Sequence, residues 1–166
     1  MLKNLVVFGF LLVSVYASAQ SLAETRTQYP EAVKNSEVAT KLDEELTDVK
    51  LTDKPVLAAY KGAALTLKAK FAKGIKHKKE FFKEGVSFIE AAVKADSTNI
   101  EIRYLRMSVQ ENSPKILGYH KDVAEDKAFI LKNYSVVSSR NLKDAVKKFV
   151  LNSDNFDASE KEKFLN

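Results

Sequence analysis

The chain has 166 residues, with 27 Lys and Arg against 22 Asp and Glu, and carries a formal net charge of +5. It contains no Cys, which excludes disulfides, a lipidated cysteine and thiol catalysis. The length suits one domain with its own hydrophobic core, and a net charge of this size does not by itself indicate nucleic-acid binding.

Residues 1–19 are predicted to be a cleaved export signal. Lys3 is followed by the apolar stretch Leu5–Val15, and Ala17-Ser18-Ala19 is a small-residue cleavage pattern that would leave Gln20 as the new N-terminus. The alternative is a membrane anchor, but this apolar stretch is well short of the roughly 20 residues that a spanning helix needs. We therefore expect an exported protein, periplasmic in a Gram-negative source and otherwise secreted, with no transmembrane segment after cleavage. Because export separates the protein from cellular nucleic acid, we expect no nucleic-acid partner.

Residues 20–166 are predicted to form a single all-α domain of about seven or eight antiparallel helices. No alternating strand pattern occurs, and apolar residues recur with the helical period between capping residues. The first helix is acidic and is expected from near Tyr29-Pro30 to Val49. The second is expected over about 54–73, with Asp53 as its cap and Pro55 in its first turn.

The second helix carries an apolar stripe and, on a different face, mostly small side chains that would let a neighbour approach closely. A third helix is expected through Phe81–Val93, ending at Asp96-Ser97. Thr98 with Glu101, Asp122 with Glu125 and Asp157 with Glu160 have the spacing of a capping box. Further helices are expected from Ser113-Pro114 to Tyr119, through Val123–Tyr134, after Ser138-Ser139, and at the C-terminus up to Phe164-Leu165.

The segment 100–112 has two apolar stripes when it is placed on a helical wheel. Ile100, Tyr104 and Met107 cluster on one side, and Ile102, Leu105 and Val109 cluster on the opposite side. A surface helix has one apolar stripe, so we expect this helix to be sandwiched between two helical layers.

Residues 55–111 resemble tetratricopeptide repeats in their spacing of large and small side chains. Tyr60, Ala63-Ala64 and Leu67 are similar to the first-helix pattern, Gly85, Ile89, Ala92 and Ser97 to the second, and Tyr104, Met107 and Ser108 would restart the first. Tyr104 follows Tyr60 by 44 residues instead of about 34, with the excess mainly around Lys73–Lys79, as in a lengthened first hairpin. The resemblance implies a TPR-like helical stack that binds a protein or peptide and has no chemistry of its own.

A polar strip on the 100–112 helix is the candidate contact site for that partner. It consists of Arg103, Arg106 and Gln110, joined by Tyr119 if the next short helix folds alongside. The alternative is structural, with both arginines paired to Glu84 or Glu90 of the preceding helix.

A basic segment between residues 61 and 83 contains eight Lys and one Glu, a local charge of +7. It is either a solvated turn that aids solubility or a patch for an anionic partner such as an acidic protein, a lipid head group or a phosphorylated glycan. The second interpretation makes the protein one that associates with an anionic envelope surface. The candidate patch consists of Lys68, Lys70, Lys73, Lys76, Lys78 and Lys79.

No sequence motif indicates an enzyme. Nucleophile-elbow, HExxH, Walker and dinucleotide patterns do not occur. His77 lies among lysines, and His120 with Asp122, Glu125 and Asp126 matches no zinc or EF-hand spacing. We therefore expect no catalytic residues, no metal site and no cofactor.

Overall fold

A computed structural model describes residues 22–165, so the expected signal at 1–19 lies outside the described residues. All regular structure within this range is helical, and no strand occurs in it. Residues 22–32 are helical, and seven α-helices and two short 3-10 helices follow. Their bounds are α2 Ser36–Glu45, α3 Pro55–Phe71, α4 Ile75–Ala95, α5 Ile100–Asn112, η1 Lys115–Leu117, α6 Val123–Asn133, η2 Tyr134–Val136, α7 Arg140–Asn152 and α8 Ala158–Glu162.

The first predicted helix is wrong, because the structure has two helices in its place. Helical residues 22–32 end in a turn, and α2 begins where the Asn35 side chain accepts hydrogen bonds from the backbone N–H groups of Glu37 and Val38. The second predicted helix is confirmed by α3, although its cap is not Asp53. The Asp53 carboxylate accepts a hydrogen bond from the Lys50 N–H, and α3 starts at Pro55 without a side-chain cap.

The small-residue face of α3 packs against α4 at two glycines. A β-carbon on Gly62 would lie 2.5 Å from the carbonyl oxygen of Gly85, and one on Gly85 would lie 2.5 Å from the carbonyl oxygen of Gly62. Both distances are shorter than a real contact allows, so the two helices can approach this closely because neither position has a side chain. The predicted close approach of a neighbour to this face is confirmed.

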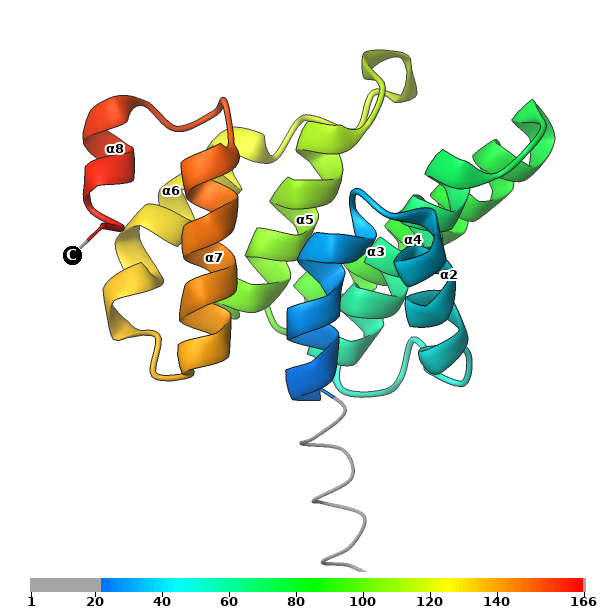
Figure 1. Ribbon diagram of the computed structural model, residues 1–166, viewed down its shortest axis with the longest axis horizontal. Coiled ribbons are helices and arrows are strands. Elements are labelled where there is room, and N and C mark those ends of the chain that lie inside the picture. Colours follow the sequence, from blue (N-terminus) through cyan, green and yellow to red (C-terminus); the bar gives the residue numbers. More distant parts are fainter. Residues whose placement is uncertain (1–21, 166) are drawn as a thin grey trace, which may run out of the picture.

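Helix α5 lies in the middle of the molecule, as Figure 1 shows, with α3 and α4 on one side and α6 and α7 on the other. Every residue from 101 to 110 is buried. Met107 from one apolar stripe and Leu105 from the other are both fully enclosed. The predicted sandwiched position of this helix is confirmed, and one hydrophobic cluster runs through the layers on both sides.

Two of the three predicted capping boxes do not form. Asn99 caps α5 in place of Thr98, and Asp122 makes no side-chain cap at α6. The box of Asp157 and Glu160 forms as predicted at α8. The helix after Ser113-Pro114 is also shorter than expected. It ends at Leu117, because the next residue, Gly118, has a φ of +66°, in the left-handed region. Phe164 is buried in the turn that follows α8.

None of the described helices is both long enough and apolar enough to cross a membrane. The longest two, α3 and α4, form a hairpin whose tip projects at the upper right of Figure 1. Residues 75–79, where the tetratricopeptide-like spacing has its excess, belong to the first turns of α4 in this tip.

Candidate functional site

The arginines of the predicted contact strip point into the protein and surround one buried carboxylate. Arg106 donates from Nε to Asp126 Oδ2 at 2.7 Å and from Nη2 to Asp126 Oδ1 at 2.7 Å. Arg103 donates from Nη1 to the same Oδ1 at 2.9 Å and to Glu125 Oε1 at 2.6 Å. Asp126 is 0% exposed and Arg106 only 4%. The guanidinium fork therefore grips the carboxylate in the bidentate geometry that gives strong, charge-assisted hydrogen bonds.

The other two residues of the strip belong to the edge of the same cluster. Gln110 donates to Asp122 Oδ2 at 3.2 Å, and the Tyr119 hydroxyl donates to Glu90 Oε1 at 2.6 Å. Burial raises the pKa of Tyr119, and the bond to Glu90 raises it further. Burial alone would lower the pKa of Arg106, but the hydrogen bonds and charge of Asp126 raise it overall.

Both arginines pair with acidic residues of the fold, as in the structural alternative to partner binding, although their main partners differ from the expected ones. Arg106 reaches Glu90 at 3.5 Å, as the sequence suggested, but both arginines bond mainly to α6. No residue of the predicted strip is more than 8% exposed, so the strip offers a partner little surface. Its residues are Arg103, Arg106, Gln110 and Tyr119. Binding of a partner by these four residues stays a prediction, and what the structure shows is that they join α5 to α4 and α6.

A second buried carboxylate joins the N-terminal helix to α5. Glu101 accepts hydrogen bonds from Arg26 Nε and Nη2, both at 2.6 Å, and from the Tyr60 hydroxyl at 2.8 Å. The bond to Glu101 raises the pKa of Arg26, and burial followed by the charge of Glu101 raises the pKa of Tyr60 well above its usual value. This pairing also explains why Glu101 does not reach back to form its capping box.

The basic segment is only partly compensated. Asp43 of α2 accepts from Lys61 at 3.0 Å and from Lys68 at 2.7 Å, and Lys70 donates to the carbonyl oxygen of Val33 at 2.7 Å. Lys61 and Lys68 of the basic segment therefore have an acidic partner in the fold. Burial alone would raise the pKa of Asp43, but its two lysine partners lower it overall.

Neither histidine joins a group that could hold a metal ion within residues 22–165. His77 is exposed and lies 3.5 Å from Glu80, one turn further along α4. The Nε2 atom of His120 is buried and has no hydrogen-bond partner in the part of the chain that the structure describes. The acids near His120 in the sequence instead face Arg103, Arg106 and Gln110.

A groove that the sequence did not indicate is lined by residues 29–34, α5 and α7. Figure 1 shows α5 between the N-terminal helix and α7. It encloses about 440 Å³. Tyr104 lies in its floor, with its ring 6.2 Å from that of Tyr29 and 5.3 Å from that of Phe149, both edge-on. Lys34 lies on one wall and Lys148 on the other. The lining residues come from three distant segments, so no local pattern could have revealed them.

A second hollow of about 230 Å³ adjoins this groove and shares four of its residues, which are Tyr29, Val33, Ser108 and Asn112. It runs toward the C-terminal ends of α3 and α5, where its lining is mostly apolar. Among the described residues that line the two hollows, Glu111 is the one acid, and its carboxylate accepts hydrogen bonds from Ser153 Oγ and Asn155 Nδ2.

Buried tyrosines predict a loss of stability at alkaline pH. Burial raises the pKa of Tyr29 to about 12 and that of Tyr104 well above the usual value of 10.0. These raised pKa values belong to the folded state, whereas in the unfolded chain both tyrosines titrate near pH 10. The neutral phenols therefore contribute stability that is complete below about pH 10, and this stability is lost as the pH rises through the folded-state pKa values. We expect phenolate absorbance to appear at higher pH in the native protein than in denaturant, together with falling resistance to urea above pH 10.

Tyr104→Phe is the variant that tests this titration. In the wild type the Tyr104 hydroxyl makes no side-chain hydrogen bond with the described residues, so the stability of the variant at neutral pH should change little. Its loss of stability above pH 10 should be smaller than that of the wild type. An alkaline loss of the same size in wild type and variant would contradict the assignment.

Comparison with known proteins gave no match with a protein-family model, a curated protein or a solved structure. The tetratricopeptide-like interpretation therefore depends on the residues of 55–111 themselves and stays a prediction.

Proposed function

We propose that this protein is an exported, non-catalytic helical scaffold that binds a protein or peptide segment in the groove between residues 22–32, α5 and α7. The observation that carries the proposal is the groove itself, which combines an aromatic floor with a lysine on each wall. A concave, mainly apolar site with a few placed polar groups is the usual form of a binding site.

The charges of the groove select the chemistry of its occupant. Lys34 and Lys148 are both exposed, whereas the carboxylate of Glu111 is already engaged by two hydrogen-bond donors. An incoming cation would find little free negative charge, and an incoming carboxylate would find two ammonium groups. We infer an extended acidic segment that also carries an apolar side chain, which would contact Val33 and Phe149.

The tetratricopeptide-like spacing supports the same class of function, because the resemblance implies a scaffold that binds a protein or peptide. The two buried carboxylates support it in a different way. Asp126 and Glu101 tie α5 to the helices around it, which holds the groove floor in one position. A rigid site loses less conformational entropy on binding than a mobile one.

Selection of random peptides displayed on phage against the immobilised protein tests the proposal. We expect enrichment of sequences in which Asp or Glu lies next to an aliphatic or aromatic residue. The variant Lys34→Glu/Lys148→Glu should bind the selected peptides about tenfold more weakly, because two attractive charges become repulsive.

The matched control is Lys50→Glu/Lys94→Glu, which reverses two exposed lysines outside the groove. It should leave peptide affinity unchanged, and both double variants should have the melting temperature of the wild type. If the two double variants lowered peptide affinity equally, the peptides would be responding to net charge, and the groove would not be the binding site.

A further inference from the structure

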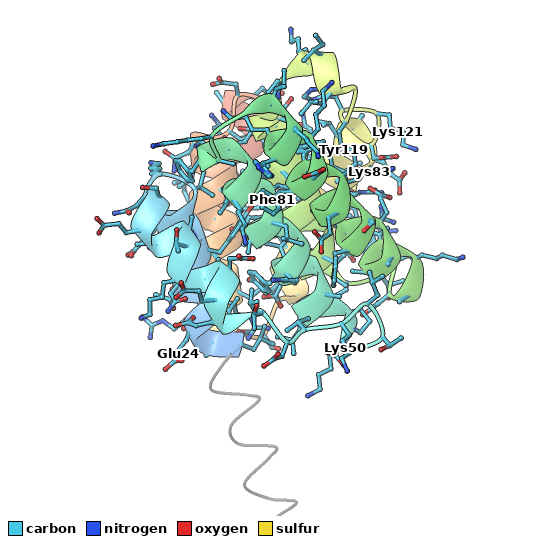
Figure 2. All side chains as sticks on the ribbon, turned by 90° about the vertical axis from the view of Figure 1, so that its right-hand side faces the viewer. Glu24, Lys50, Phe81, Lys83, Tyr119 and Lys121 are labelled. Atoms are coloured by element: carbon cyan, nitrogen blue, oxygen red, sulfur yellow. The ribbon has the colours of Figure 1, made fainter. Side chains whose placement is uncertain are left out.

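Two projecting tips at one end of the molecule each expose an isolated apolar side chain. At the tip of the α3–α4 hairpin, the first residue of α4, Ile75, is 75% exposed. In the loop between α5 and α6, Ile116 is 93% exposed. Phe71 and Leu117 beside them are each 38% exposed. Figure 1 shows both tips at the upper end of the protein, and the loop is again uppermost in Figure 2. Residues 71–79 and 115–121 are called the tip surface below.

The tip surface is strongly basic. Residues 71–79 and 115–121 together contain six Lys and no Asp or Glu. One of them, Lys76, lies 4.0 Å from Glu80. The remaining lysines have no ion pair or side-chain hydrogen bond with any described residue, and all are exposed. They are Lys73, Lys78, Lys79, Lys115 and Lys121.

The two tips belong to one continuous surface. Lys78 and Phe82 of α4 line the same hollow as Pro114 and Leu117 of the loop. The ring of Phe82 also lies 6.0 Å from that of Tyr119, edge-on, at the base of the loop, and Figure 2 shows Tyr119 close to Lys83 of α4 and Lys121. The two tips are therefore joined at their bases, and both project at the same end of the protein (Figure 1).

We propose that the tip surface docks on an anionic lipid bilayer, with Ile75 and Ile116–Leu117 entering the interface and the lysines contacting the head groups. Large apolar side chains that project singly from a basic surface suit a membrane interface, where apolar atoms enter the acyl boundary and ammonium groups stay in the head-group layer. The surface contains no Arg, so it lacks the planar fork used for specific bidentate phosphate recognition. A diffuse array of ammonium groups fits a lipid surface of similar charges better than one defined phosphate.

The expected strength follows from the number of unpaired lysines. Each Lys near an anionic membrane strengthens binding roughly fivefold, and salt weakens the attraction because it acts over about a Debye length. A single buried isoleucine adds less than a lipid anchor, so binding should be reversible and should require both the charges and the apolar tips.

Sedimentation of the full chain with vesicles tests the proposal, using phosphatidylglycerol mixed with phosphatidylcholine against phosphatidylcholine alone. The N-terminal apolar segment is common to all samples, so the readout is the difference between the two vesicle types. Lys73→Glu/Lys78→Glu/Lys79→Glu should reduce binding to anionic vesicles about a hundredfold or more. Its control, Lys50→Glu/Lys54→Glu/Lys94→Glu, reverses the same number of charges away from the tips and should retain most of the binding.

The apolar tips are tested separately. Ile75→Ser/Ile116→Ser should weaken binding about tenfold, because two partly inserted side chains are lost. Leu51→Ser/Val136→Ser removes apolar side chains that are 50% and 78% exposed elsewhere and should have no effect. Because the chain has no Trp, Ile116→Trp introduces a single tryptophan, which can be excited selectively over the tyrosines. Its emission should shift to the blue with anionic vesicles, and that of Val136→Trp should not.

Equal binding to both vesicle types, or no blue shift at position 116, would overturn the proposal. The proposal would also be overturned if Ile75→Ser/Ile116→Ser bound anionic vesicles as well as the wild type. That result would indicate a surface that binds polyanions in general, and polyphosphate should then compete with the vesicles at low salt. The groove variant Lys34→Glu/Lys148→Glu should bind vesicles nearly as the wild type does. The tip surface and the peptide groove can therefore fail independently.

Discussion

Replacing Asp126 with alanine is expected to lower the free energy of unfolding by about 3–5 kcal/mol, because it leaves two buried guanidinium groups without their shared anion. Asp126 is fully buried and accepts from both Arg103 and Arg106. Urea unfolding followed by far-UV circular dichroism measures the loss. Against a typical stability of about 5–15 kcal/mol, such a change would leave the variant partly unfolded at moderate temperature.

Glu125→Ala is the matched control for this variant. Glu125 also accepts from Arg103, at 2.6 Å, but its side chain is 61% exposed. A water-exposed ion pair contributes about 0–1 kcal/mol, so the control should unfold nearly like the wild type. Equal stability of the Asp126 and Glu125 variants would mean that burial does not determine the role of these pairs.

The double variant Arg103→Ala/Arg106→Ala separates the two roles considered for the arginines. If the arginines are structural, the double variant should lose as much stability as Asp126→Ala, because the buried carboxylate of Asp126 is then unpaired. Loss of peptide binding at an unchanged melting temperature would instead support the predicted contact strip.

Truncating either apolar stripe of α5 is expected to cost about 2–5 kcal/mol, since both stripes lie in packed layers. Leu105 and Met107 are each 0% exposed and belong to opposite stripes. Leu105→Ala and Met107→Ala should therefore both shift the urea midpoint strongly. In a helix at the surface of a bundle, truncation would be costly on one side alone.

Val136→Ala provides the baseline for these truncations. Val136 is 78% exposed, and surface substitutions of this kind usually change stability by less than about 0.5 kcal/mol. A variant of Leu105 or Met107 that unfolds like Val136→Ala would show that its stripe is not packed, and the layered arrangement around α5 would then be incorrect.

Helices that depend on nearby residues were predictable from the sequence. Pro55 and the apolar stripe of α3 predict that helix almost where the structure has it. The capping box predicted for Asp157 and Glu160 forms at the start of α8. The double stripe of residues 100–112 also predicted a helix enclosed on both sides. The break between residues 22–32 and α2 was missed, because its cap is formed by Asn35, a single residue inside an otherwise helical pattern.

The sequence by itself determined the all-helical class and the enclosed position of α5, because helical periodicity and capping operate over a few neighbouring residues. Only the tertiary structure decided the partners of the charged groups. Glu101 has the spacing of a capping residue, yet it pairs with Arg26, 75 positions away in the chain. The groove lined by Tyr29, Tyr104 and Phe149 was decided in the same way, since its parts meet only when three distant helices pack together.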